Sequence, residues 1–243
     1  MKKKFKVSYS YPLEHPIKVV IEKLGRLGLL GWLMQKYGKD ANVKDLVISE
    51  RIIELPLFHQ WVGKIFPKPE GKFLEIGHVA SSTSLELASL GFDVTAIDLR
   101  DYPFTHKNLE SIKGNFLNHS FDKQFDLIFS LSTIEHFGFS RRYGGEDKTD
   151  DHLDENAFQK IRELLKSEGR AIVSFPYAKA FVPDIWFRVY TRNDVESKLE
   201  RYFQIEESRF YRRDDNEWTI VTRRNNDPIS PHDGVALFLL KGK

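Results

Sequence analysis

The chain has 243 residues, of which 41% are hydrophobic and 30% charged, as expected for a folded protein with a sizeable core. Its formal net charge is only +2, so it lacks the basic excess that is typical of nucleic-acid-binding proteins. It has no cysteine, which excludes disulfides, thiolate metal sites and a cysteine nucleophile.

The amino terminus carries four lysines between Met1 and Lys6, and no long apolar stretch follows them. We interpret this run as a solvated terminus, with contact to an anionic membrane surface as the alternative. The most apolar window, residues 27–34, is too short to span a bilayer. These features predict a soluble, cytoplasmic protein without a signal peptide or transmembrane segment.

Two helices are predicted before the first strand. Apolar residues recur at helical spacing from Pro16 to Tyr37, although three glycines at three-residue intervals weaken this helix. A second helix should cover residues 48–65, where Pro56 would bend or split it. We therefore expect residues 1–69 to form a helical extension that packs on a core domain of residues 70–243.

From residue 72 onward, short β-type segments alternate with helical ones, which predicts an α/β fold with a parallel sheet. The expected strands are residues 72–76, 93–97, 109–113, 125–131, 170–175, 203–210 and 235–240, with 218–222 as a candidate extra strand. The expected helices are residues 83–90, ending at Gly91, 155–166, and 191–201, capped by Thr191 or Asn193. The last strands follow one another without a helix, so we expect an antiparallel C-terminal edge.

The stretch LEIGHVASSTSLELASLGFDVTAIDLR, residues 74–100, carries the main functional signal. One strand ends in the acid Glu75, a tight turn begins at Gly77, and the next strand ends in a second acid, Asp98. In doubly wound sheets, ligands bind at the carboxyl ends of the strands. Gly77 lets a ligand approach the backbone, and Asp98 is placed to accept hydrogen bonds from ribose hydroxyls.

This order resembles motif I of class I S-adenosylmethionine-dependent methyltransferases. That family usually has three glycines after the acid, whereas Val79 and Ser81 stand here in place of the second and third. A dinucleotide fingerprint needs its glycines so that a pyrophosphate can sit against the helix N-terminus. Because S-adenosylmethionine has no phosphate, the substituted turn favours it over a nicotinamide cofactor.

Three further blocks resemble the same family. After the third strand, the resemblance places Asn115, where the family more often has Asp, beside the adenine amino group, and Phe116 near the adenine ring. FDLIFSLSTIEHFG, residues 125–138, resembles motif IV, and LLKSEGRAIVSFP, residues 164–176, resembles the segment that follows it. The resemblance covers about residues 70–243. It implies a Rossmann-like, seven-stranded, mostly parallel sheet with an antiparallel C-terminal strand.

The resemblance implies S-adenosyl-L-methionine as the cofactor, held at the carboxyl ends of the first four strands. The expected cofactor-binding residues are Glu75, Gly77, His78, Ser81, Asp98, Leu99, Asn115, Phe116 and Ser132.

His136 lies just past the fourth strand, where the methyl acceptor is expected, and is the candidate catalytic residue. A histidine can take the proton from an acceptor hydroxyl at neutral pH. In the alternative interpretation, Glu135 and His136 only orient the following segment.

No metal is predicted. Similar ubiquinone-pathway O-methyltransferases bind a divalent ion through a Glu and a Glu-His pair three residues later, but here the first position is Ser132. The acidic loop of residues 146–154 could supply the missing oxygen ligands for magnesium, although such a loop is more often simply solvated.

The chain is also similar to a bacterial and archaeal group that carries a STIEH motif and is often linked to sugar or glycan pathways. We therefore expect O-methylation of a small hydroxylated acceptor such as a sugar or glycan precursor. The segments 137–154 and 177–190 should border its pocket. The absence of an Asp-Pro-Pro-Tyr type motif argues against methylation of exocyclic base amines, and the absence of cysteine argues against methylation of pyrimidine C5. Two alternatives stay open: a protein that binds S-adenosylmethionine without turnover, and a nicotinamide-dependent oxidoreductase.

Overall fold

The structure is a computed structural model that describes residues 49–139, 152–180, 187–215 and 217–243. The chain divides into two compact units, residues 1–47 and residues 48–243. The helix predicted at 16–37 lies outside the described residues, so the architecture below is that of the second unit.

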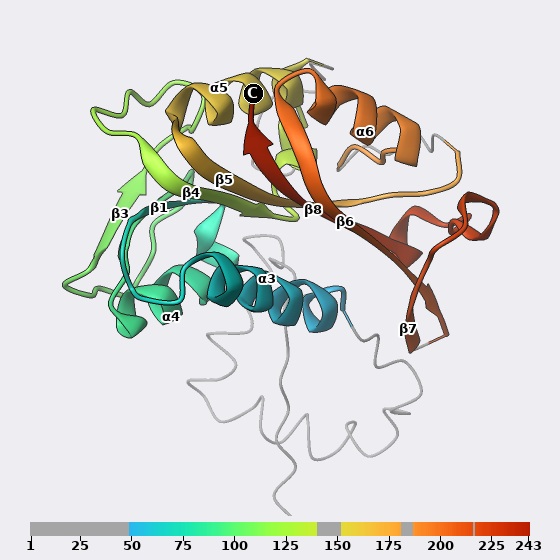
Figure 1. Ribbon diagram of the computed structural model, residues 1–243, viewed down its shortest axis with the longest axis horizontal. Coiled ribbons are helices and arrows are strands. Elements are labelled where there is room, and N and C mark those ends of the chain that lie inside the picture. Colours follow the sequence, from blue (N-terminus) through green and yellow to red (C-terminus); the bar gives the residue numbers. More distant parts are fainter. Residues whose placement is uncertain (1–48, 140–151, 181–186, 216) are drawn as a thin grey trace, which may run out of the picture. The chain divides into compact units, whose positions relative to one another are not determined.

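An eight-stranded sheet forms the centre of this unit, in the order β3-β2-β1-β4-β5-β8-β6-β7 (Figure 1). The strands are β1 (Lys72–Ile76), β2 (Asp93–Asp98), β3 (Leu109–Lys113), β4 (Phe125–Leu131), β5 (Leu165–Pro176), β6 (Phe203–Asp214), β7 (Glu217–Ile220) and β8 (Gly234–Gly242).

The strands β1 to β5 pair in parallel, whereas β8 lies antiparallel between β5 and β6. The predicted Rossmann-like, mostly parallel sheet with an antiparallel C-terminal strand is therefore confirmed. The predicted number of seven strands is wrong, because β7 pairs with the end of β6 as an eighth, edge strand. This strand corresponds to the candidate extra strand at 218–222.

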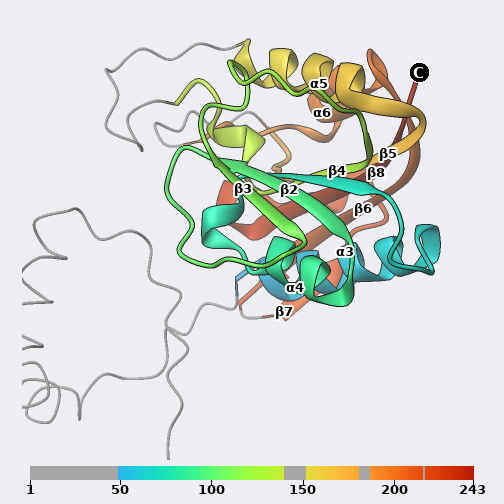
Figure 2. The same ribbon diagram turned by 90° about the vertical axis from the view of Figure 1, so that its left-hand side faces the viewer.

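Helices cover both faces of the sheet. The helices are α3 (Arg51–Ile65), α4 (Thr83–Leu90), α5 (Leu153–Leu164) and α6 (Arg192–Glu200). Figures 1 and 2 show α3 and α4 on one face and α5 and α6 on the other. None of the described helices is both long and apolar enough to cross a lipid bilayer.

Local sequence signals explain where these helices begin and end. Gly91 ends α4 with a φ of 105°, as predicted. Thr191, one of the two predicted caps, begins α6 through a capping box with Asp194. The prediction was that Pro56 bends or splits the helix; α3 continues through Pro56, which excludes the split. The proline costs only one backbone hydrogen bond, and the buried residues that follow it hold the helix on the sheet.

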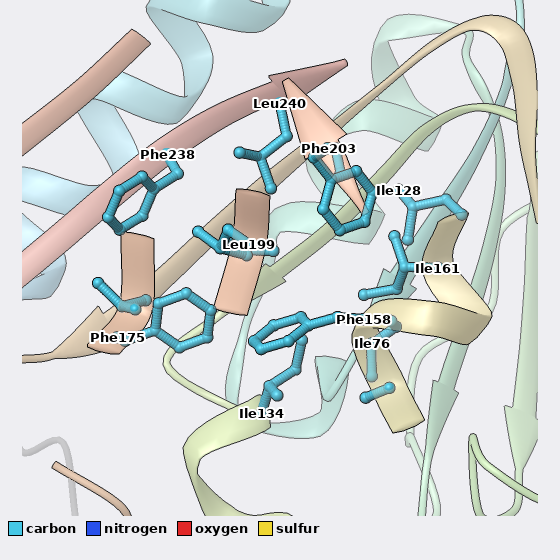
Figure 3. Packing of buried hydrophobic residues seen from close by; sticks show 14 of the residues in the cluster. Ile76, Ile128, Ile134, Phe158, Ile161, Phe175, Leu199, Phe203, Phe238 and Leu240 are labelled. Carbon is cyan, nitrogen blue, oxygen red and sulfur yellow. The ribbon is translucent and has the colours of Figure 1, made fainter. Parts of the chain in front are cut away.

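Each face of the sheet has its own apolar cluster. On one face, residues of α5 and α6 such as Phe158, Ile161 and Leu199 pack against alternate strand residues (Figure 3). On the other, Phe58 and Trp61 of α3 join Leu87 of α4 and the opposite set of strand residues. The strands β1 and β4 lie between these layers, so their carboxyl ends are held rigidly and can position a site.

Candidate functional site

The turn that follows β1 requires glycine at its first position. Gly77 has a φ of 89°, and a Cβ there would lie 2.3 Å from side-chain atoms of Thr133, which follows β4. The Gly77 N–H donates to the carbonyl of Ile97 at 2.8 Å, which ties the turn to β2. The turn is therefore packed between the ends of β2 and β4, and no other residue fits without displacing Thr133.

A short 3-10 turn, His78–Ala80, replaces a glycine-rich loop. The His78 side chain is fully buried, with its Nε2 2.8 Å from the Ser111 Oγ of β3 and its ring 4.7 Å from that of Tyr102. Burial lowers the pKa of His78, so the ring is neutral at pH 7. His78 thus fills the space between the first turn and β3.

Ser81 of the same turn provides hydrogen-bond partners for the beginning of α4. The Ser81 Oγ accepts a hydrogen bond from the Thr83 N–H at 3.0 Å, and its own hydroxyl donates to the Thr83 Oγ1 at 2.7 Å. Part of the hydrogen-bonding capacity that a phosphate group would use at this helix terminus is therefore already taken.

Glu75 connects β1 to the beginning of α4, on either side of the turn. Its side chain is 2% exposed and accepts a hydrogen bond from the Ser84 hydroxyl of α4. Burial raises the pKa of Glu75 to about 7, although the hydrogen bond from Ser84 opposes this rise. Near neutral pH this carboxyl exchanges a proton, and it links β1 to α4 in either form.

Asp98, the last residue of β2, carries the negative charge of this region. It accepts hydrogen bonds from the Val79 N–H and from both the backbone and the guanidinium of Arg100. Burial alone would raise the pKa of Asp98, but these hydrogen bonds outweigh it and hold the pKa below its usual value. The side chain is therefore an ionised carboxylate at neutral pH.

The residues predicted to surround adenine follow β3, the strand that pairs with β2. The Gly114 N–H donates to the Asp98 carbonyl at 2.8 Å, which brings the segment after β3 alongside the end of β2. Asn115 is exposed, and its Oδ1 accepts from the Leu117 N–H at 2.9 Å. Phe116 is buried in the apolar cluster under α5, whereas Leu99 is 47% exposed.

A second group of polar residues lies at the ends of β4 and β5. Ser132 has a φ of 47°, a conformation that is uncommon for a residue with a side chain. Its N–H donates to the Ser174 Oγ at 2.9 Å and its hydroxyl donates to the Glu54 Oε1 at 2.5 Å. The Ser174 hydroxyl also donates to the Glu54 Oε1, at 2.5 Å. These three hydrogen bonds fix the strained turn.

Glu54 is the site residue that the sequence analysis missed. It comes from α3, is fully buried, and lies with its other carboxylate oxygen 3.2 Å from Arg51. The helical spacing of Glu54, Phe58 and Trp61 puts them on one face, which could have indicated burial of this acid. Ile52 of the same helix, although apolar, is 56% exposed.

Glu135 and His136 follow Ser132 in a 3-10 turn, Ile134–His136. The Glu135 side chain is 3% exposed, and its Oε2 has no hydrogen-bond partner among the described residues. Burial, together with the nearby charge of Glu54, holds the pKa of Glu135 well above its usual value. The His136 Nε2 lies 4.0 Å from the Glu135 Oε1, and its ring packs edge-on against Phe187. His136 thus lies between β4 and the segment after β5.

Within the described part of the chain, no three His, Asp or Glu side chains converge to hold a metal ion. Residues 146–151 of the acidic loop lie outside the described residues. Asp154, the last acid of that segment, is fully buried, and it pairs with Arg188 at 3.0 Å and Lys198 at 2.9 Å. The sequence interpretation of Asp154 as part of a solvated loop is therefore wrong, because this acid is buried and pairs with the buried Arg188 and the partly buried Lys198.

A surface depression of about 460 Å³ lies elsewhere, between the end of α3 and residues 166–170. Because this depression borders the amino ends of β4 and β5, it is opposite to the carboxyl ends where ligands of doubly wound sheets bind.

Comparisons with known proteins give the fold. No protein-family model and no curated protein sequence matches the chain. Among solved structures, it is similar to the N-methyltransferase NodS from Bradyrhizobium japonicum in complex with S-adenosylhomocysteine. The TM-score is 0.55 and the identity 15%, over 85% of this chain and 91% of that one.

A second similar structure is 1,6-didemethyltoxoflavin-N1-methyltransferase from Burkholderia thailandensis, with bound 1,6-didemethyltoxoflavin and S-adenosylhomocysteine. The TM-score is 0.54 and the identity 13%, over 96% of this chain and 93% of that one. A protein from Pyrococcus horikoshii gives 0.52 and 18%, over 82% and 94%. The described unit therefore has the fold of S-adenosylmethionine-dependent methyltransferases.

Proposed function

We propose that this protein is an S-adenosylmethionine-dependent methyltransferase that acts on a small acceptor. The observation that carries this proposal is the ionised Asp98 at the end of β2, next to the glycine turn that ends β1. Two methyltransferases of the same fold have bound S-adenosylhomocysteine in their structures, which supports the choice of cofactor.

The residues of the first turn suit a nucleoside without phosphates. The buried His78 ring fills the turn, and Ser81 satisfies an N–H group at the beginning of α4. A dinucleotide needs both the open turn and that helix terminus for its pyrophosphate. S-adenosylmethionine needs neither, so these contacts favour it over a nicotinamide cofactor.

In this proposal, the cofactor-binding residues stay those expected from the sequence. Asp98 would accept the ribose hydroxyls, Asn115 the adenine amino group, and Gly77 would allow close approach of the backbone. Bound S-adenosylmethionine supplies a methyl group on a positively charged sulfur. The protein then mainly aligns the acceptor and excludes water.

For the acceptor, we propose a small hydroxylated molecule such as a sugar or glycan precursor, methylated on oxygen. His136 would take the hydroxyl proton, and Phe187 packs beside its ring at 6.0 Å between centroids. The neutral form that a base requires is available to histidine near pH 7. The aromatic side chain gives an apolar surface on which a sugar or planar ring can lie.

Calorimetric titration with S-adenosylhomocysteine, with NAD as the control ligand, tests the proposal. We expect binding of S-adenosylhomocysteine and none of NAD. An acceptor panel of hydroxylated and amino compounds, assayed for S-adenosylhomocysteine formation, then tests turnover. Binding without turnover on any acceptor would favour a cofactor-binding protein, and failure to bind S-adenosylhomocysteine would overturn the proposed function.

A further inference from the structure

The carboxylate of Asp98 uses all of its usual hydrogen-bonding positions within the described residues. Its Oδ1 accepts from the Arg100 N–H and the Arg100 Nε, both at 3.0 Å. Its Oδ2 accepts from the Arg100 Nη2 at 3.0 Å and from the Val79 N–H at 3.1 Å. A carboxylate has about four lone-pair positions, so a ribose at this place must replace an existing donor.

The four donors are not equally replaceable. The two backbone N–H groups are fixed by the turn after β1 and by the end of β2. The two guanidinium donors belong to a side chain that is 39% exposed, whereas that of Asp98 is 5% exposed. Arg100 can therefore turn into solvent, where water replaces its hydrogen bonds, but Asp98 cannot.

The guanidinium donors also form a pair. The Nε and Nη2 groups donate to different oxygens of one carboxylate, which is the bidentate arrangement that makes such contacts strong. A ligand with a single hydroxyl would replace one of these bonds and leave the other position empty. A vicinal diol, such as the 2′- and 3′-hydroxyls of a ribose, would replace both.

We propose that Arg100 is a specificity-determining residue that occupies the ribose position of Asp98 and yields it only to a ligand with a vicinal diol. This inference rests on the proposed function. Arg100 would compete with the ribose for the Asp98 carboxylate, so removal of the Arg100 side chain should strengthen cofactor binding. A residue that only held Asp98 in place would have the opposite effect, because its removal would weaken binding.

The test compares the unaltered 243-residue chain with Arg100→Ala by calorimetric titration with S-adenosylhomocysteine. We expect Arg100→Ala to lower the dissociation constant about tenfold, the amount that corresponds to one net hydrogen bond to a charged group. The matched control is Arg212→Ala. Arg212 donates through Nε and Nη2 to the exposed Asp214, two residues along β6, at 2.9 and 2.6 Å. This control should leave the dissociation constant unchanged.

A second pair of ligands tests the diol itself. Adenosine should gain affinity in Arg100→Ala, whereas 2′,3′-dideoxyadenosine, which lacks both hydroxyls, should not. An equal gain for the two ligands would overturn the proposal, because Arg100 would then only obstruct the site. Thermal unfolding of each variant shows whether it is folded before titration.

The outcomes separate this inference from the proposed function. Binding to the wild type with equal or weaker binding to Arg100→Ala overturns the role of Arg100 and leaves the methyltransferase proposal standing. Tighter binding to Arg100→Ala supports both. No binding of S-adenosylhomocysteine to either protein overturns both.

Discussion

At the scale of single residues, the buried carboxyl of Glu75 makes stability depend on pH. Its usual pKa is 4.5, and burial raises it to about 7 in the folded protein. Between these values the folded state holds a proton that the unfolded state has released, so the free energy of unfolding falls as the pH rises. Below pH 4.5 both states are protonated, and above pH 7 both are ionised, so Glu75 adds no slope there.

The expected size of this effect follows from the two pKa values. A tenfold change in proton affinity corresponds to about 1.4 kcal/mol, so the raised pKa amounts to about 3 kcal/mol. Glu75→Gln keeps the shape of the protonated side chain and should be the more stable protein at pH 8 by about this amount. Urea unfolding of both proteins between pH 4.5 and 8 measures the difference.

Glu54 and Glu135 also have raised pKa values, and they make stability depend on pH equally in the wild type and in Glu75→Gln. The difference in stability between these two proteins therefore reports on Glu75 alone. Glu70→Gln, at an exposed position of the connector before β1, serves as the control and should follow the wild type. Identical pH profiles for the wild type and Glu75→Gln would contradict this account of Glu75.

His136 allows a second prediction at this scale, on activity. If His136 takes the acceptor proton, His136→Ala should lower turnover by about 10²–10⁴ and leave S-adenosylhomocysteine affinity unchanged. Initial rates on the acceptor found in the panel give the first quantity, and calorimetry gives the second. His59→Ala, on the half-exposed face of α3, is the matched histidine control. A rate close to that of the wild type would mean that His136 only orients its segment.

At the scale of elements, α3 contributes to the site through one side chain. Glu54→Ala would leave the buried Ser174 hydroxyl and the strained Ser132 turn without their shared acceptor. We predict a loss of about 1–3 kcal/mol in the free energy of unfolding, the usual cost of an unsatisfied buried group. Glu54→Gln retains an acceptor oxygen and should recover part of this loss.

Chemical denaturation measures both variants. Gln60→Ala removes an exposed side chain from the same helix and should leave stability nearly unchanged. Equal stability of Glu54→Ala and Gln60→Ala would show that the hydrogen bonds of Glu54 do not hold the turn after β4.

The elements were predictable where local signals and periodicity agree. Gly91 and Thr191 mark helix termini by their own chemistry, and the buried strands β1 and β4 consist mostly of apolar residues. The edge strand β7 was only a candidate, because an exposed strand has neither an apolar run nor strict alternation. Glu54 could not be assigned to the site from the sequence, since the partner serines lie 78 and 120 residues away.

The same limit applies to Asp98. Its position at the end of β2 was predictable from the strand and turn pattern. The interaction with Arg100 was not, because a side chain two residues away points toward or away from an acid depending on the tertiary turn around it. The charge of the site could thus be predicted from the sequence, but its hydrogen-bonding state could not.

At the scale of the whole molecule, α3 belongs to the layer that closes one face of the sheet. It buries Leu57, Phe58, Trp61 and Val62 against the sheet and α4. Full burial of one such side chain contributes about 1.5–3 kcal/mol, so these four contribute about 6–12 kcal/mol. This is comparable to the total stability of an ordinary domain, about 5–15 kcal/mol.

We therefore predict opposite outcomes for two truncated chains. Residues 48–243 retain both apolar clusters and should unfold cooperatively, whereas residues 70–243 lack α3 and should not fold. Without α3, Phe73 and Phe129 would face solvent on β1 and β4, and Ser132 would lose the acceptor that Glu54 provides. Circular dichroism and urea unfolding, with the chain of residues 1–243 as reference, distinguish the two. Cooperative unfolding of residues 70–243 at the reference midpoint would mean that α3 is an addition to a domain that is complete without it. If only the chain of residues 70–243 lacks a cooperative unfolding transition, α3 is an essential part of the fold. This would explain why Glu54, which comes from α3 and not from a strand, fixes the turn after β4.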